Sequence, residues 1–302
     1  MRRWMELKAF LIHLRLHYQF FILSGAFLAG AVFSGGIDTR IFLIQFFNVH
    51  VLLFGGVTVY NSYWDKDTGP IGGLQHPPAL AAWTLPASWL LQVLGLAIAW
   101  GVSAESAAAY SAAMLFFWFY SRPGIRWKGR PHLSLVAIGI STGFCGFLLG
   151  WLHKGAHASA PAAALAAAGV TCIIVSLFPM SQVYQVGEDL ERQDVTFTAK
   201  YGLPGVRLAF RSLFFLGIVA FAASLAWLEP ALGGVFLAVG ALAGALIGRE
   251  MRALEMSPGQ YARVMRIKYS ASLLFVTFLA TVLGLQSRGM FLPRLAIPTL
   301  LP

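Results

Sequence analysis

Residues 41–62, IFLIQFFNVHVLLFGGVTVYNS, decide the fold class, because these 22 positions hold no Asp, Glu, Lys or Arg. A helix needs about 20 mostly apolar residues to cross the hydrocarbon core of a bilayer. Eight further apolar runs lie at 17–34, 79–101, 106–121, 133–152, 160–184, 208–228, 231–248 and 269–287. None alternates between apolar and polar residues as the strands of a membrane barrel do, and in lipid only helices satisfy the backbone of such runs. The sequence therefore predicts an all-α, polytopic membrane protein with nine transmembrane helices in a bundle.

The composition of the whole chain supports a membrane location. Of its 302 residues, 58% are hydrophobic and 11% are charged, and the mean hydropathy is +0.71. A soluble domain carries about 25% charged residues, so this chain has too few to cover a surface in water. Its two cysteines, Cys145 and Cys172, both lie inside apolar runs, which argues against a disulfide framework or a CxxC metal site.

The net charge of +10 would suggest a nucleic-acid partner in a soluble protein, but the positions of the basic residues give it another meaning. With the N-terminus in the cytoplasm, 18 of the 22 Lys and Arg residues fall in the N-terminal segment and in the loops after spans 2, 4, 6 and 8. The four on the other side are Arg40, Lys154, Arg288 and Arg294. Cytoplasmic loops of membrane proteins are enriched in Lys and Arg. We therefore expect a cell (inner) membrane protein with its N-terminus and these loops in the cytoplasm, and no nucleic-acid partner.

Residues 1–16, MRRWMELKAFLIHLRL, mix basic side chains with Trp, Leu and Phe. This composition is typical of a helix that lies in the membrane surface, and we expect an interfacial amphipathic helix here. A cleaved signal peptide is the alternative, but Glu6, Lys8 and Arg15 interrupt the apolar stretch that it would need.

The acidic residues are few and clustered. Six of the twelve lie in two cytoplasmic loops, namely Asp65 and Asp67 after span 2, and Glu188, Asp189, Glu191 and Asp194 after span 6. Carboxylates contribute little to topology, so their positions need another reason. If both loops meet in a cytoplasm-facing polar cap on the bundle, they would suit Mg²⁺, which binds through carboxylates and substrate phosphates. The pattern indicates a metal-assisted diphosphate site, with ordinary solvated loops as the alternative.

The spacing of polar residues sharpens this interpretation. Asn61 and Asp65 are four residues apart at the end of a predicted helix, so both point along one helix face. Gln185 and Asp189 have the same spacing. Between the two loops lie residues 120–130, YSRPGIRWKGR, whose cations are of the kind that bind diphosphate oxygens.

Three segments resemble motifs of the UbiA superfamily of intramembrane prenyltransferases. Residues 61–67, NSYWDKD, resemble the NDxxDxxxD motif that follows helix 2 in this family, and residues 182–202, QVYQVGEDLERQDVTFTAKYG, resemble the region around its DxxxD motif after helix 6. Residues 120–128, YSRPGIRWK, are similar to its Tyr-Ser-x-Pro segment. Two positions depart from the pattern: Gly69 stands where the first motif ends in Asp, and either Gln185 or Glu188 stands at the first Asp of the second motif.

This resemblance implies that the whole chain, 1–302, is one UbiA-like domain. It would transfer a prenyl group from an isoprenoid diphosphate to a lipophilic acceptor, for which we expect an aromatic compound, and would release pyrophosphate. Mg²⁺ would be the cofactor, and donor, acceptor and membrane lipids the partners. The implied catalytic residues are Asp65 and Asp189. The further implied residues are the metal ligands Asn61, Asp65, Asp67, Gln185, Glu188 and Asp189, the diphosphate-binding Lys66, Arg126, Lys128, Arg192 and Lys200, and the substrate-binding Tyr120 and Tyr184.

Other functions stay open at this level. A terpene cyclase of the same superfamily would share metal and diphosphate binding but needs no acceptor. A haem-binding cytochrome needs two facing histidines inside the spans, and of the seven histidines only His50 lies well inside one. A transporter or scaffold is disfavoured because the charged residues that mark ion pathways are nearly absent from the spans. Most of the tyrosines near the motifs are better interpreted as interfacial anchors.

Overall fold

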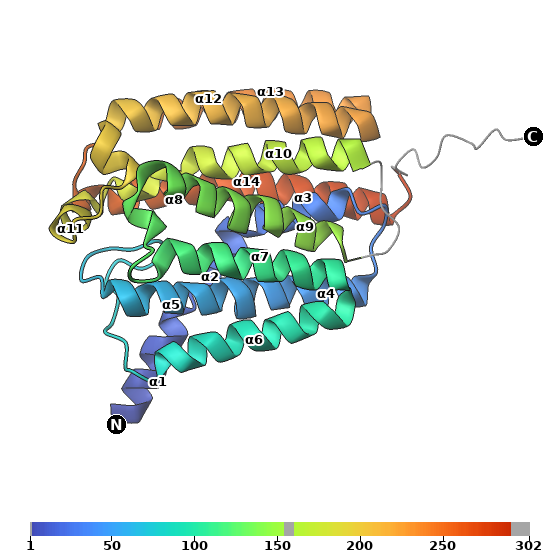
Figure 1. Ribbon diagram of the computed structural model, residues 1–302. Coiled ribbons are helices and arrows are strands. Elements are labelled where there is room, and N and C mark those ends of the chain that lie inside the picture. Colours follow the sequence, from blue (N-terminus) through green and yellow to red (C-terminus); the bar gives the residue numbers. More distant parts are fainter. Residues whose placement is uncertain (1, 154–159, 291–302) are drawn as a thin grey trace, which may run out of the picture.

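The computed structural model describes residues 2–153 and 160–290, and within these ranges the chain forms a bundle of long helices that run side by side (Figure 1). Outside the helices, the described residues contain one isolated bridge pair, Ile71 with Leu74. Seven described segments are long and apolar enough to cross a membrane: Thr39–Asp65, Thr84–Val102, Pro131–Trp151, Ala160–Gln182, Phe197–Leu228, Pro230–Arg252 and Pro258–Ser287. The chain is therefore an all-α integral membrane protein, as the composition predicts.

The helices have the following bounds in chain order: α1 (Arg2–His13), α2 (Leu16–Ile22), α3 (Ser24–Val32), α4 (Thr39–Phe47), the π-helix η1 (Asn48–Phe54), α5 (Gly55–Asp65), α6 (Thr84–Val102), α7 (Ala104–Ser121), the 3₁₀-helix η2 (Trp127–Gly129), α8 (Pro131–Ile138), the π-helix η3 (Gly139–Phe144), α9 (Cys145–Trp151), α10 (Ala160–Leu177), the 3₁₀-helix η4 (Pro179–Gln182), α11 (Val186–Glu191), α12 (Phe197–Leu228), α13 (Pro230–Arg252), the 3₁₀-helix η5 (Pro258–Gln260) and α14 (Tyr261–Ser287).

Two of the nine expected spans are not among the seven spanning segments of the described chain. The run 17–34 forms two short helices, α2 and α3, because the helix is interrupted at Leu23. The run 106–121 lies in α7, whose 18 residues include Glu105, three serines and two tyrosines and are therefore less apolar. Both regions still pack within the bundle, α3 against α9 and α10, and α7 against α6 and α9.

The helix that leads to the candidate site is longer than the hydrocarbon core of a bilayer is thick. α4, η1 and α5 together run from Thr39 to Asp65. Its 27 residues, at 1.5 Å each, measure about 40 Å, against about 30 Å for the hydrocarbon core of a bilayer. This length is enough for the last turns of α5, which carry Asn61 and Asp65, to extend past the core.

Two local signals shape the segment between α10 and α12. Pro179, whose nitrogen has no hydrogen to donate, lies two residues beyond the last residue of α10, Leu177. This helix therefore stops before the end of the predicted run 160–184. Thr196 caps α12, and its hydroxyl accepts a hydrogen bond from the backbone nitrogen of Ala199 at 3.3 Å. α12 therefore starts well before the predicted run 208–228. The short helix α11 lies between these two boundaries and carries part of the second acidic cluster.

A close helix crossing holds α3 in the bundle. α3 and α9 meet where Gly30 faces the backbone of Phe147 and where Gly150 faces the backbone of Phe27, and a Cβ at either glycine would collide with that backbone. Small residues are common at crossings of membrane helices because they let two backbones approach closely. This crossing fixes α3 against α9.

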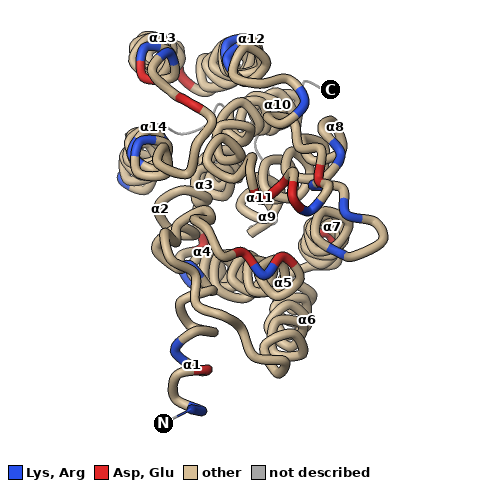
Figure 2. Tube along the Cα trace, turned by 90° about the vertical axis from the view of Figure 1, so that its left-hand side faces the viewer, with Lys and Arg blue, Asp and Glu red and all other residues tan. Residues whose placement is uncertain are grey.

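Charged residues gather at one end of the bundle. Figure 2 looks onto this end and shows acidic and basic segments on the last turn of α5, around α11 and on the loop before α8. Of the four cations that the sequence assigns to the opposite side, Lys154 and Arg294 lie outside the described residues. α1 lies at the charged end (Figure 1) with Trp4 and Met5 exposed, at 67% and 65%. Its place in the membrane surface stays a prediction.

Candidate active site

A cavity of about 220 Å³ lies at the charged end of the bundle and extends between the helices. Eight of the residues predicted for the site line it together: Asn61, Asp65, Asp67, Tyr120, Lys128, Tyr184, Gln185 and Asp189. The two acidic loops, which are more than a hundred residues apart in the sequence, therefore meet at one cavity.

The end of α5 presents two of these side chains along one face. Nδ2 of Asn61 donates a hydrogen bond of 2.7 Å to Oδ2 of Asp65 and another of 3.0 Å to Oγ of Ser121 on α7. The four-residue spacing in the sequence therefore places both side chains as helical geometry requires. The helix ends at Asp65 because Lys66 takes a left-handed conformation, with φ of 50°.

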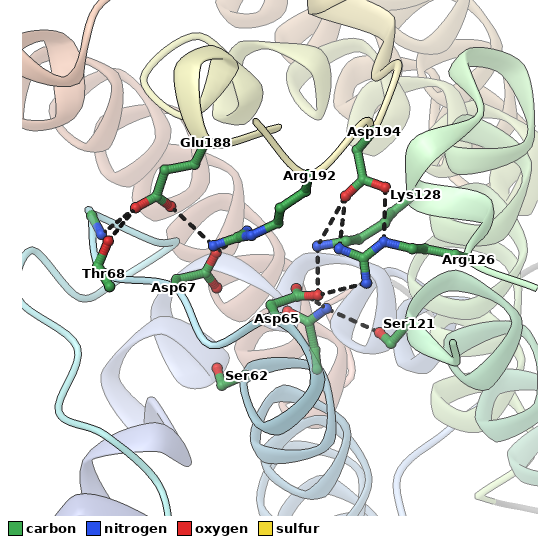
Figure 3. A network of polar contacts seen from close by, with 12 residues as sticks. Ser62, Asp65, Asp67, Thr68, Ser121, Arg126, Lys128, Glu188, Arg192 and Asp194 are labelled. Carbon is green, nitrogen blue, oxygen red and sulfur yellow. Dashed lines mark hydrogen bonds and ion pairs between the residues drawn. The ribbon is translucent and has the colours of Figure 1, made fainter. Parts of the chain in front are cut away.

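Asp65 belongs to a group of two carboxylates and two cations (Figure 3). Nζ of Lys128 lies 2.6 Å from Oδ1 of Asp65, and Nη1 of Arg126 donates to the same oxygen at 3.3 Å. Arg126 also donates two hydrogen bonds of 2.7 Å to the carboxylate of Asp194, and Lys128 lies 3.8 Å from that carboxylate. The two negative and two positive charges balance each other.

Arg192 joins the two acidic loops. Its guanidinium lies 2.7 Å from Oδ1 of Asp67 and 3.4 Å from Oε2 of Glu188 (Figure 3). The other oxygen of Glu188 accepts hydrogen bonds from the hydroxyl of Thr68 at 2.8 Å and from the backbone nitrogen of Gly69 at 2.6 Å. Glu188 therefore holds the turn after α5 in place.

Asp189 and Gln185 form the other carboxylate and amide pair of the cavity. Asp189 is 6% exposed, and its backbone nitrogen donates to the carbonyl of Gln185 at 2.9 Å. Burial raises the pKa of the Asp189 carboxyl to about 7, while Lys128 opposes this shift and Asp194 adds to it. Gln185 lines the cavity, whereas Glu188 does not.

The oxygen atoms of the cavity form a donor set for a metal ion. Among the residues that the structure describes, no three side chains of His, Cys, Asp or Glu are grouped closely enough to hold one. The cavity instead offers carboxylate and amide oxygens from two sides, α5 and the segment around α11. Mg²⁺ needs one or two carboxylates when waters and phosphate oxygens complete its coordination. This donor set therefore fits Mg²⁺ that binds together with a phosphate ligand.

Four of the five predicted diphosphate contacts do not line this cavity. Lys66 is exposed, and it lines a separate surface groove beside Pro77 and Pro78. Lys200 is exposed on α12, with its Nζ atom 5.2 Å from the ring centre of Tyr201. Lys128 lines the cavity, whereas Arg126 and Arg192 reach its carboxylates from outside the lining.

Three charged residues of the site region were missed by sequence reasoning. Asp194 is buried and completes the charge group around Asp65, but it has no partner at the four-residue spacing that singled out Asp189. Arg15 and Lys268 line the cavity from the turn before α2 and from α14, each with 7% exposed. The sequence offers no signal that separates these two cations from those that set topology.

The inner part of the cavity is apolar. Its lining there includes Ile22, Val57, Phe117, Ile174 and Leu177. A second cavity of about 70 Å³ shares part of this lining and continues between α10, α12, α13 and α14, where it meets Phe214, Phe236, Phe275 and Phe278. A charged mouth above an apolar interior suits a ligand with an anionic head and a hydrocarbon tail.

Fold and site together define a helical membrane protein whose cavity joins carboxylates and cations to an apolar interior. The sequence matches the profile of the UbiA prenyltransferase family over residues 20–270. The chain therefore belongs to the UbiA prenyltransferase family.

Solved structures share this fold. A UbiA homologue from Archaeoglobus fulgidus bound to GPP and Mg²⁺ has a TM-score of 0.69 at 15% identity, with 91% of this chain and 99% of that chain covered. A structure of a UbiA homologue from the same organism bound to DMAPP and Mg²⁺ gives 0.65 at 15% identity, with 90% and 99% covered. A structure of digeranylgeranylglyceryl phosphate synthase gives 0.58 at 17% identity, with 92% and 99% covered. No curated protein matches significantly.

Proposed function

We propose that this protein transfers a prenyl group from an isoprenoid diphosphate to a lipophilic acceptor, with Mg²⁺ as cofactor and release of pyrophosphate. The observation that carries this proposal is the single cavity that joins Asp65 and Asp189, at its charged mouth, to an apolar interior. The diphosphate suits the mouth, and the hydrocarbon tail suits the interior. Membership of the UbiA prenyltransferase family, and relatives bound to DMAPP or GPP with Mg²⁺, support the same reaction.

Asp65 and Asp189 are the proposed central ligands of Mg²⁺, with Asn61, Asp67 and Gln185 beside them. Glu188 would join them only after leaving the turn that it holds. When bound, the ion supplies Lewis-acid stabilisation of the negative charge on the leaving pyrophosphate.

The cations of the site prepare the departure of the diphosphate. Arg126, Lys128 and Arg192 contact protein carboxylates, and we expect them to exchange these partners for phosphate oxygens when the donor binds. Charge-assisted hydrogen bonds to phosphate are strong, and they gain strength as negative charge develops on the leaving group. Lys66 and Lys200 would contribute only if the segments that carry them moved over the donor, because both are exposed outside the cavity.

The carbon that loses the diphosphate, C1 of the donor, develops positive charge that must be stabilised until a nucleophile bonds to it. Tyr120 and Tyr184 line the cavity, and aromatic rings can stabilise a cation that develops near their faces. The C1–O bond breaks with its electron pair going to pyrophosphate. The nucleophilic atom of the acceptor then bonds to C1 and loses a proton. An aromatic acceptor is expected because its ring can act as this nucleophile.

We also propose that the chain, 1–302, is a single domain with nine spans, in which α2 with α3 forms the first span and α7 adds another. The charged end would face the cytoplasm at the cell (inner) membrane, supported by the 18 cations assigned to that side. Single cysteines in place of Lys66 and Arg288 test this in intact cells. A membrane-impermeant thiol reagent should label Arg288→Cys and spare Lys66→Cys, and the opposite pattern would reverse the orientation.

The activity is tested with Asp65→Asn and Asp189→Asn in purified protein whose fold is checked by gel filtration. Each variant should lose at least about 100-fold in Mg²⁺-dependent pyrophosphate release, because it removes a proposed contact to the leaving-group ion. Glu191→Gln, an exposed carboxylate of the same loop, is the matched control. Full activity in either Asp variant would remove that residue from the mechanism.

Product analysis separates the remaining reactions. A prenylated acceptor supports transfer, whereas a cyclised hydrocarbon formed from the donor alone would indicate a terpene cyclase. A wild-type protein that releases no pyrophosphate with any donor in the presence of Mg²⁺ would point to a transporter or scaffold instead.

A further inference from the structure

α1 leaves the bundle sideways. In Figure 1 it runs across the direction of the long helices, close to their charged ends, and in Figure 2 it points away from the bundle beside α6. The long helices are the ones that can cross the membrane. A helix that runs across their direction at one end of the bundle would lie along the membrane surface.

The outer face of α1 is apolar. Its inner face packs on the protein, where Phe10 is buried and its ring centre lies 5.3 Å from that of Trp83. Trp4, Leu7 and Leu11 are exposed, and residues at these three- and four-residue spacings share one face of a helix. An apolar face that points away from the protein is unfavourable in water, whereas it suits the boundary between lipid headgroups and acyl chains.

Basic residues border this apolar face. Arg2, Arg3 and Lys8 are all exposed. Arg2 pairs with Glu6 one turn further along the helix. Arg3 and Lys8 belong to none of the ion pairs found in the described ranges of the chain. An apolar helix face with basic residues at its edges fits a membrane surface that contains anionic headgroups.

The inner face of α1 binds the loop between α5 and α6, residues 66–83. Oε2 of Glu6 accepts a hydrogen bond of 3.1 Å from the indole nitrogen of Trp83. Two turns further along, Nε2 of His13 donates to the carbonyl oxygen of Pro78 at 2.8 Å. α1 is therefore attached to the part of the loop that leads into α6.

The residues that follow α1 bind the middle of the same loop. Nη1 of Arg15 donates to the carbonyl oxygen of Gly72 at 3.1 Å. Nε2 of His17 donates to the carbonyl oxygen of Gly73 at 2.9 Å. Gly72 also lines the central cavity, as does Asp67 near the start of the loop. The loop that forms part of the cavity wall is therefore held from the side of α1 by four hydrogen bonds.

We propose that α1 binds the surface of an anionic membrane, and that this contact holds the loop and its Asp67 at the cavity mouth. The inference rests on the prenyl transfer proposed above. Lipid and loop contact opposite faces of one helix, so each contact favours the position of α1 that the other needs. A membrane surface without negative charge attracts Arg3 and Lys8 less, so α1 and the loop would leave their places more often.

The first experiment measures backbone hydrogen exchange of the full-length protein in nanodiscs of phosphatidylcholine, alone or mixed with phosphatidylglycerol. The anionic lipid should slow exchange at least about threefold in residues 2–13 and in residues 66–83, because both segments would open less often. Exchange in the middle of α13 should not change. Equal exchange in the two lipids, or slowing confined to residues 2–13, would overturn the inference.

Charge variants test whether the basic border of α1 carries the effect. Arg3→Gln combined with Lys8→Gln should abolish the difference between the two lipids. Arg249→Gln combined with Arg252→Gln removes two exposed cations from the end of α13 and should preserve it. Loss of the difference in this control as well would mean that any cation near the surface has the same effect, and would overturn the inference.

A further variant tests the link between α1 and the loop. His13→Leu combined with His17→Leu removes two of the four hydrogen bonds and leaves the outer face of α1 unchanged. The anionic lipid should then still slow exchange in α1, but should slow it less in the loop. Undiminished slowing in the loop would show that the lipid acts on it by another route, and would overturn the inference.

Pyrophosphate release connects the device to the reaction. Because Asp67 is a proposed neighbour of Mg²⁺, the anionic lipid should lower the half-saturating Mg²⁺ concentration about three- to tenfold. Anionic lipid also attracts Mg²⁺ by itself, so the effect is measured against the Arg3→Gln, Lys8→Gln variant in the same two lipids. An equal effect in wild type and variant would overturn the inference and leave the proposed function intact. Lipid-dependent exchange without any pyrophosphate release would overturn the proposed function and leave the lipid contact of α1 standing.

Discussion

Replacing Asp194 by Asn tests the charge balance around Asp65. The carboxylate of Asp194 accepts two hydrogen bonds of 2.7 Å from Arg126 and lies 3.8 Å from Lys128. Hydrogen bonds to charged groups contribute about 1.5–3 kcal/mol each, but Asn can keep one of them in neutral form. The Arg126 side chain is 25% exposed, which weakens its pair further. We therefore expect a coupling of about 2 kcal/mol between positions 194 and 126.

The same substitution raises the positive charge beside Asp65. Arg126 and Lys128 would then share one carboxylate instead of two, so both would hold Asp65 more tightly against Mg²⁺. If about 1.4 kcal/mol of this coupling opposes Mg²⁺ binding, the half-saturating Mg²⁺ concentration for pyrophosphate release should rise about tenfold. The apparent unfolding temperature of the solubilised protein should fall, because a partly buried guanidinium loses one of its two counter-ions.

The assay is a double-mutant cycle. Asp194→Asn, Arg126→Gln and the double variant are each compared with the wild type in thermal unfolding and in Mg²⁺ titration. Glu191→Gln removes an exposed carboxylate from the same loop and serves as the control. A coupling below about 0.5 kcal/mol, together with an unchanged Mg²⁺ requirement, would refute this account of the charge group.

Three further predictions concern protonation, the outlying lysine and the helix crossing. Burial raises the pKa of Asp189 to about 7, and a carboxylate must be deprotonated to bind a metal ion. The half-saturating Mg²⁺ concentration should therefore rise up to about tenfold for each pH unit below this pKa and should be constant above it. Identical Mg²⁺ titrations on both sides of the pKa would contradict this. Lys128→Met should raise the half-saturating donor concentration at least about tenfold, whereas Lys66→Met should change it less than about twofold. An equal rise in both variants would mean that the turn after α5 closes over the donor. Gly150→Leu should lower the apparent unfolding temperature and the yield of folded protein, because the leucine side chain would collide with the backbone of α3. Gly284 faces open space, so Gly284→Leu should match the wild type. Equal melting curves for the two variants would show that the helix crossing can open.

The end of α5 shows what the sequence could predict. Asn61 and Asp65 are four residues apart in one helix, and their side chains bond at 2.7 Å, so helical geometry alone was sufficient. Gln185 and Asp189 line the same cavity, and here the motif order after the sixth apolar run was the useful signal. Both predictions depend on contacts that lie within one turn of a helix.

Arg15 and Lys268 show what the sequence could not predict. They lie at opposite ends of the chain, and they share a cavity because α2 packs against α14. The pairing of Arg126 with Asp194 depends on a loop in which Arg126 takes a left-handed conformation, with φ of 40°. The spacing of residues along the chain predicts neither the shared cavity of Arg15 and Lys268 nor the ion pair of Arg126 with Asp194.

The helices, too, were predicted only in part from the sequence. Length and hydropathy identified the long helices, but the interruption at Leu23 follows no proline. The early end of α10 could have been read from Pro179, which the hydropathy of the run 160–184 outweighed. Apolar composition reports that a segment belongs in lipid, and it says little about where the helix within that segment breaks.

The ion pairs of Figure 3 also bear on how the protein is made. Asp65 and Asp194 have Arg126 and Lys128 as counter-ions, and Arg192 ties the second loop to the first. These carboxylates therefore have their counter-ions within the chain itself, and a newly inserted polypeptide can complete its fold before it meets Mg²⁺ or an isoprenoid. A chelator should then remove the metal without unfolding the protein, so that biogenesis does not depend on the supply of its substrates.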